Sequence, residues 1–170
     1  MKLYTLILSF CLSFLIYSQE HAMNWYFGTK AGLTFNTYPP TPLTDGAIIQ
    51  REGNATISDK EGNLLFYTDG SIVWNKKHQR MHNGTGLSGQ HIAAQSCIIA
   101  QQPTHSNIYY LFTVSDWQNK SGSLSYSIVD ISEDNGLGAV IEKNVLINSK
   151  CREQISAVYA NENGDVWILS

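Results

Sequence analysis

Apolar and polar residues follow a short, regular pattern in residues 53–75, GNATISDKEGNLLFYTDGSIVWN. Three runs rich in β-branched and aromatic residues, at 55–58, 64–68 and 71–74, are separated by Asp, Gly and Asn. Runs with a period near two between such residues are typical of antiparallel strands joined by tight turns. The stretch therefore predicts a β-meander.

The same pattern extends over most of the chain. Further strands are predicted at residues 25–28, 31–35, 47–50, 96–101, 108–114, 124–131, 139–147, 156–160 and 166–170. Residues 36–46 predict a loop because Pro39, Pro40 and Pro42 cannot donate to a central ladder. Residues 75–86 are polar and lack periodicity, which predicts a loop with at most one short edge strand.

Three segments of the chain resemble one another. Residues 55–68, 96–113 and 156–170 each contain a first strand with small residues, a polar turn, and a second strand with aromatic residues. In the middle segment two more strands follow. Four antiparallel strands in a unit of roughly 40 to 60 residues are typical of a β-propeller blade.

We therefore expect an all-β fold made of about two and a half four-stranded antiparallel propeller blades. The blade units are approximately 53–92, 95–148 and 155–170. Because a propeller typically needs four or more blades to close, we expect an incomplete propeller whose partners include the remaining blades of a longer parent chain. An open β-solenoid or a small sandwich is the alternative.

The N-terminal residues predict export. Residues 1–18 have a basic start and an apolar stretch that is short for a membrane span, as in a cleaved signal peptide. Cys11 follows the bulky Phe10, so lipidation is not expected. We expect residues 19–170 to form a secreted or cell-surface region with no membrane span.

The composition excludes some partners. The hydrophobic fraction of 43% is enough for a core, and the charged fraction is only 15%. Without Lys2, the 11 Lys and Arg become ten against 14 Asp and Glu, a net charge of −4, which argues against nucleic-acid binding. Export permits a disulfide between Cys97 and Cys151, but Cys97 lies in an apolar run that also suits a buried thiol.

Few residues suggest chemistry. His78, His82 and His91 lie in a predicted loop without a helix face, so we assign no metal site. The segment 59–63 and the dipeptide at 69–70 are predicted turns.

Carboxylates and aromatic side chains remain as candidates. Asp69, Asp116 and Asp130 could supply a carboxylate pair for glycoside hydrolysis, but their convergence cannot be read from the sequence. We assign no catalytic residue and no cofactor. Trp117 lies in the polar turn 115–122 and is the one candidate ligand contact. The other aromatic candidates are expected to pack between blades, namely Trp25, Trp74, Tyr109, Tyr110 and Trp167.

Several segments carry a family resemblance. Residues 24–35 (NWYFGTKAGLTF), 55–70, 73–75 (VWN) and 82–86 (HNGTG) resemble the N-terminal region of large secreted, gliding-motility-associated proteins of Bacteroidetes. Proteins of that kind often end in a type IX secretion sorting domain, which these 170 residues do not include. The resemblance implies a propeller-like cell-surface region and supplies no catalytic residues.

The function expected from the sequence is non-enzymatic. A secreted or cell-surface propeller fragment would bind or scaffold a protein or glycan partner through loops such as 75–91 and 115–122. A carbohydrate hydrolase or lyase is the alternative, and a purely structural spacer is the third. Acidic groups converging on the propeller axis would favour the enzyme, whereas an axis lined by Ser, Ala and Thr would favour the binder.

Overall fold

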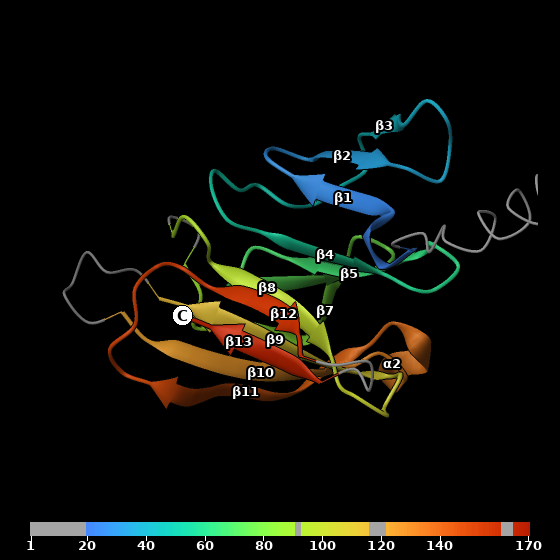
Figure 1. Ribbon diagram of the computed structural model, residues 1–170. Coiled ribbons are helices and arrows are strands. Elements are labelled where there is room, and N and C mark those ends of the chain that lie inside the picture. The colour runs from blue at the N-terminus through green and yellow to red at the C-terminus, as the bar shows by residue number, and fades with distance from the viewer. Residues whose placement is uncertain (1–19, 91–92, 116–121, 161–164) are drawn as a thin grey trace, which may run out of the picture.

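The computed structural model describes residues 20–90, 93–115, 122–160 and 165–170 and is an all-β fold, as the sequence predicts (Figure 1). The predicted signal peptide and Trp117 both lie outside the described residues. No helix among the described segments is long and apolar enough to cross a membrane.

The first layer is a three-stranded antiparallel sheet. A single 3-10 turn, η2 (Glu20–Ala22), leads into β1 (Asn24–Phe27), which pairs with β2 (Ala31–Thr34), and β2 pairs with β3 (Thr41–Leu43). The prediction of a loop over residues 36–46 is therefore wrong at Thr41–Leu43, which form β3. Pro42 is accommodated there because β3 is an edge strand with β2 as its neighbour.

The strand predicted at 47–50 is also wrong. Only an isolated bridge forms there, between Ile49 and Thr29. Ile48 is nevertheless fully buried, so the apolar residues of this segment fill the core without joining a ladder.

An eight-stranded sheet forms the centre of the molecule. Its first half, in chain order, contains β4 (Ala55–Ser58), β5 (Leu64–Thr68), β6 (Ile72–Asn75) and β7 (Arg80–Thr85). Its second half contains β8 (Cys97–Gln101), β9 (Ile108–Val114), β10 (Leu124–Asp130) and β11 (Ala139–Asn148). Each half pairs antiparallel in chain order, which confirms the meander predicted for residues 53–75.

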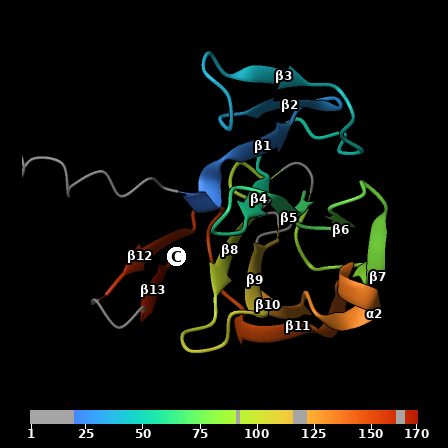
Figure 2. The same ribbon diagram turned by 90° about the vertical axis from the view of Figure 1, so that its right-hand side faces the viewer.

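The two halves join through β7 and β11. These strands meet in parallel at the pair His82 and Ala139. Strand β7 is therefore an interior strand of the sheet, and its prediction as a loop or edge strand is wrong. The edge strands β4 and β8 lie close together, so the mixed sheet is nearly closed (Figure 2). Because the halves share one sheet, the structure does not show separate four-stranded blades.

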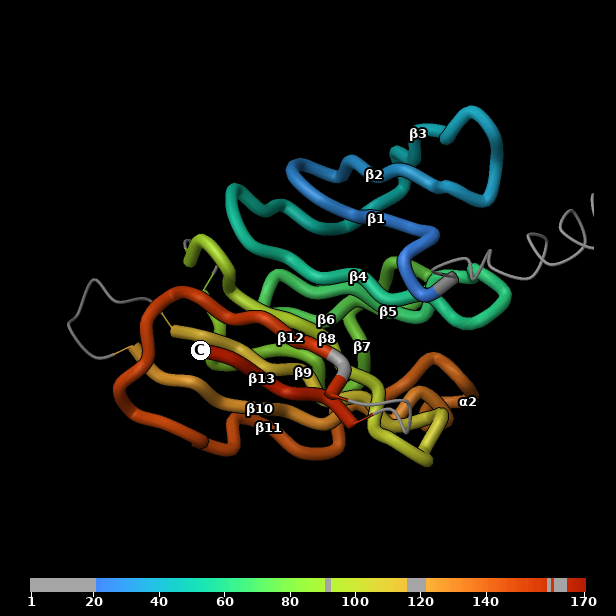
Figure 3. The backbone as a smooth tube through the Cα atoms, in the orientation of Figure 1, coloured from blue at the N-terminus to red at the C-terminus, as the bar shows by residue number. Residues whose placement is uncertain are grey.

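A tight turn and a hairpin complete the fold. The turn α2 (Glu133–Gly136) joins β10 to β11, with Asp134 and Asn135 in the left-handed region. The hairpin of β12 (Ser156–Tyr159) and β13 (Val166–Leu169) forms a separate two-stranded sheet. In Figures 1 and 2 it lies beside β8. The tube in Figure 3 follows the layers from blue to red in chain order.

Three apolar clusters hold successive layers together. The first, between the β1–β3 sheet and the β4–β7 half, contains Tyr26, Ile48, Tyr67 and Trp74. The second fills the space between the two halves of the central sheet, with Phe66, Val73, Met81, Cys97, Tyr109, Leu111, Val129 and Val140 among its members. The third cluster joins the β8–β11 half to the hairpin and to the segment that precedes the hairpin. Its buried residues are Val114, Leu124, Cys151 and Ile155.

Cys97 and Cys151 are both buried and free. Cys97 belongs to the central cluster and Cys151 to the third, so the structure agrees with the buried-thiol alternative.

Candidate functional site

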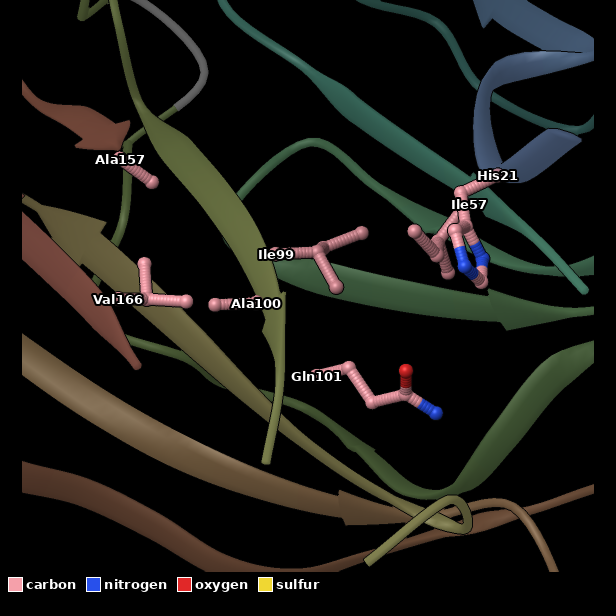
Figure 4. Close-up of a pocket in the computed structure, with 7 residues that line it drawn as sticks. All are labelled: His21, Ile57, Ile99, Ala100, Gln101, Ala157 and Val166. Atoms are coloured by element: carbon pink, nitrogen blue, oxygen red, sulfur yellow. The ribbon is translucent and has the colours of Figure 1, made fainter. Parts of the chain in front are cut away.

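One cavity lies where strands β4 and β8 meet the C-terminal hairpin. It has a volume of about 200 Å³ and is walled by β4, β8 and the hairpin (Figure 4). Its lining is His21, Ile57, Ile99, Ala100, Gln101, Ala157 and Val166. Aliphatic side chains therefore dominate the described part of the lining, which contains no carboxylate.

A second cavity of about 280 Å³ adjoins the first and shares Ala100, Gln101 and Val166 with it. Pro103, Asp165, Ile168 and two aromatic side chains, Tyr110 and Phe112, complete its lining. We call the two cavities together the β8 cleft.

Aromatic rings form one wall of the β8 cleft. Tyr110 and Phe112 stand two residues apart in β9 and are therefore on the same face of the sheet, with ring centroids 6.0 Å apart. Tyr126, opposite Phe112 in β10, brings a third ring within 5.6 Å of Tyr110. All three are half-buried, so part of each ring is open to solvent.

The polar groups of the cleft are held in place by hydrogen bonds. Gln101 Nε2 donates to the backbone oxygen of Ser106 at 2.9 Å and to the Tyr109 hydroxyl at 3.3 Å. His21 Nδ1 donates to the backbone oxygen of Ser58 at 3.0 Å, since a carbonyl can only accept. An amide and an imidazole are thus fixed in the lining of the cleft, which also includes Asp165.

Of the acidic candidates, the two that the structure describes, Asp69 and Asp130, do not line this cleft. Asp69 Oδ1 accepts from the backbone nitrogens of Ser71 and Ile72, both at 2.8 Å, and so fixes the turn between β5 and β6. Asp130, the last residue of β10, accepts from the nitrogen and hydroxyl of Ser132 at 2.9 and 2.6 Å. Asp116 lies outside the described residues.

The turn prediction for segment 59–63 is confirmed. Asp59 Oδ1 accepts from the backbone nitrogens of Glu61 and Asn63, at 3.0 and 2.7 Å. The carboxylate is therefore used to close the turn between β4 and β5, as the Asp and Gly in the sequence indicate.

His78 has a role that the sequence did not reveal. Its Nε2 lies 3.3 Å from Asp45 Oδ2 and its Nδ1 lies 3.2 Å from the Tyr67 hydroxyl. Because a carboxylate only accepts, Nε2 carries the proton, and Tyr67 donates to Nδ1 while accepting from the backbone nitrogen of Ala47. Asp45 also accepts from the Tyr26 hydroxyl at 3.0 Å. We call these residues the Asp45 network.

The Asp45 network has the order of a catalytic triad, but its hydroxyl is inaccessible. Tyr67 is completely buried between Tyr26 and Trp74, which stack on it. The pKa of Tyr26 is raised mainly by burial and further by the hydrogen bond and the negative charge of Asp45. The pKa of Tyr67 is raised mainly by burial. Both phenols therefore stay protonated, and the network holds the first sheet to the second layer.

The histidines form no metal site within the described part of the chain, where no group of three or more His, Cys, Asp or Glu side chains is arranged to hold an ion. His91 lies outside the described residues, and the loop 75–91 contains strand β7. Sequence reasoning missed the pairing of His78 with Asp45 because Asp45 lies in a Pro- and Gly-rich loop without periodicity.

The five aromatic packing candidates differ in burial, and Tyr110 is half-buried in the wall of the β8 cleft. Trp74 and Tyr109 are buried in the core, as expected for packing residues. Trp25 and Trp167 are 49% and 64% exposed, so their expected burial between blades is not seen within these 170 residues.

Comparison with protein-family models, curated proteins and solved structures finds no match to this chain. The function must therefore be argued from the residues themselves.

Proposed function

We propose that this chain is an exported, propeller-type β-sheet region that binds a glycan at the cell surface in the β8 cleft without chemical turnover. The single observation that carries the proposal is the lining of the cleft: aromatic rings and aliphatic side chains with a few fixed polar groups. Ligand sites commonly combine an apolar surface with a small number of placed polar groups.

The side chains that line the β8 cleft favour a glycan over a charged ligand. The apolar C–H faces of a pyranose ring pack well against aromatic rings such as Tyr110 and Phe112. Gln101 supplies amide chemistry, and Asp165 supplies a carboxylate that can accept from sugar hydroxyls.

The same lining argues against a hydrolase. Glycoside hydrolysis generally uses two carboxylates flanking the scissile bond. Among the described residues, Asp165 is the one carboxylate in the lining of the cleft. The carboxylates of Asp59 and Asp69 instead accept hydrogen bonds within their own turns.

The propeller interpretation is supported by the order of the layers. Each half of the central sheet is an antiparallel meander in chain order, and the first strands β1, β4, β8 and β12 contact one another in sequence. First strands of successive blades meet in this way around a propeller axis. The β8 cleft would then lie near that axis.

An oligosaccharide array followed by product analysis tests the proposal. We expect binding to at least one glycan, with that glycan recovered intact after long incubation. Gln101→Ala and Tyr110→Ala should each weaken binding by about tenfold or more, which corresponds to the loss of one good contact. Arg152→Ala, at a separate surface depression, is the matched control.

Cleavage of the bound glycan would overturn the non-enzymatic proposal. Binding that survives both cleft substitutions would place the site elsewhere, and no binding to any glycan on the array would reject a glycan ligand.

A further inference from the structure

Gln101 has both hydrogens of its amide nitrogen in use, whereas its amide oxygen is open to the β8 cleft. Its Nε2 donates to the backbone oxygen of Ser106 and to the Tyr109 hydroxyl. A backbone oxygen can only accept, so these bonds also fix which end of the amide is the nitrogen. In Figure 4 the oxygen, Oε1, is turned toward the side of the cavity where Ile57 and His21 lie. Gln101 therefore offers this cavity an acceptor.

The other polar side chains of the cleft offer acceptors as well. His21 Nδ1 donates to the backbone oxygen of Ser58, so in the neutral imidazole Nε2 is an acceptor. Asp165, in the lining of the second cavity, is a carboxylate and can only accept when ionised. Among the described lining side chains, the Tyr110 hydroxyl is the one that can also donate to a ligand.

The cleft lining offers little to an anion. Within the described residues it contains no Lys or Arg, so no side chain of permanent positive charge lines it. Strand β8 is an edge strand, and an open strand edge carries N–H and C=O groups alike, which gives no preference for donors or acceptors. Burial of a charged group without a partner is strongly unfavourable. The side chains therefore set the selectivity of the cleft, and they favour a ligand that carries donors.

We infer that the β8 cleft selects neutral, hydroxyl-rich sugars over acidic sugars, with Gln101 Oε1 as the hydrogen-bond acceptor for one sugar hydroxyl. This inference rests on the proposed glycan binding and names the class of sugar. A hydroxyl can donate to Oε1, whereas a uronate carboxylate or a sulfate group only accepts. A site built to bond a hydroxyl rejects the analogue that lacks it, because the polar groups of the site are then left unpaired.

Two glycans that differ in one kind of group test the selectivity. The first is the neutral glycan that binds best on the array, and the second is the same glycan with its primary alcohols oxidised to carboxylates. Isothermal titration calorimetry should show the neutral glycan binding tighter by about tenfold or more, as expected for the loss of one good hydrogen bond. This comparison uses the unsubstituted chain and so does not depend on the folding of any variant.

Fluorinated analogues of the neutral glycan test the acceptor. Replacing one hydroxyl by fluorine removes the donor, and we expect one such analogue to bind the unsubstituted chain about tenfold more weakly than the parent glycan. Gln101→Leu lacks the acceptor and should bind that analogue and the parent equally. Gln102→Leu, next in the chain but outside the described cleft lining, is the matched control and should keep the difference. Circular dichroism of both variants should match that of the unsubstituted chain.

The results that overturn the inference differ from those that overturn glycan binding itself. If the acidic glycan binds as tightly as the neutral one and both lose affinity in Tyr110→Ala, the cleft binds glycans but the inferred selectivity is wrong. Fluorinated analogues that all bind like the parent, or a difference that persists in Gln101→Leu, exclude Gln101 as the acceptor. If no glycan binds in the cleft, both proposals are rejected.

Discussion

The ring of Tyr26 in β1 stacks on the ring of Tyr67 in β5, with centroids 4.7 Å apart and planes inclined by 17°. Both hydroxyls belong to the Asp45 network. Tyr26 donates to Asp45, and Tyr67 donates to His78, which is paired with Asp45. The first sheet is therefore held to the second layer by stacked rings and by a polar network at their ends.

Removing the Tyr67 hydroxyl should weaken this connection. In Tyr67→Phe the backbone nitrogen of Ala47 loses its acceptor and His78 Nδ1 loses its donor. We expect the free energy of unfolding to fall by about 1–3 kcal/mol, the usual cost of unpaired buried polar groups. Urea denaturation measures it, with Tyr38→Phe as the exposed control. A change below about 0.5 kcal/mol, as at ordinary surface sites, would contradict the role of the network.

The turn between β5 and β6 should depend on Asp69. The carboxylate is buried and accepts from the nitrogen and hydroxyl of Ser71 and the nitrogen of Ile72, each at 2.8 Å. Asp69→Ala should lower the free energy of unfolding by about 1–3 kcal/mol. Asp130 is only half-buried and, among the described residues, its side chain bonds to Ser132 alone, so Asp130→Ala is a matched control that should cost less.

Glycan binding separates this structural role from a catalytic one. In Asp69→Ala the folded protein should bind the array glycan as the unsubstituted chain does. An equal cost for the two Asp substitutions, or loss of glycan binding with intact folding in Asp69→Ala alone, would refute the assignment of Asp69 as a turn residue.

The buried thiol of Cys97 should make stability depend on alkaline pH. Burial raises the pKa of Cys97 from 9.0 to about 12. Between these values the unfolded chain releases the proton while the folded protein keeps it, so the free energy of unfolding falls as the pH rises. The contribution is fully present below pH 9 and is lost towards pH 12.

Chemical denaturation from pH 8 to 10 measures this effect. Cys97→Ala should show a shallower decline than the unsubstituted chain, whatever its stability at pH 8. Thiol reagents should modify Cys97 only as fast as the protein unfolds, since the side chain is buried. Identical pH slopes in the two proteins, or rapid modification of Cys97 in the folded state, would contradict the buried, protonated thiol.

The strand pattern was predictable from local sequence, whereas the layer contacts were not. Alternation gave the position of β10 and a continuous apolar run gave that of β9, and buried and more open positions alternate along most of both strands. Strand β7 (Arg80–Thr85) was missed since its polar residues lack that alternation, and Pro42 concealed β3 because an edge strand tolerates proline.

The candidate site was harder to predict because its residues come from separate units. Tyr110 and Phe112 were visible as aromatic residues in a strand, but nothing local places Val166 opposite them. Trp117, the one predicted ligand contact, lies outside the described residues and stays a prediction.

The most direct test of glycan binding in the β8 cleft is a titration of the ¹⁵N-labelled chain with the best array glycan, followed by backbone amide chemical shifts. The account predicts that the largest shifts cluster at Ala100, Gln101, Tyr110, Phe112 and Val166, around the cleft. It predicts that these shifts are lost in Tyr110→Ala and kept in Arg152→Ala. Shifts centred on the Asp45 network or on the depression at Arg152, with the cleft unchanged, would contradict it.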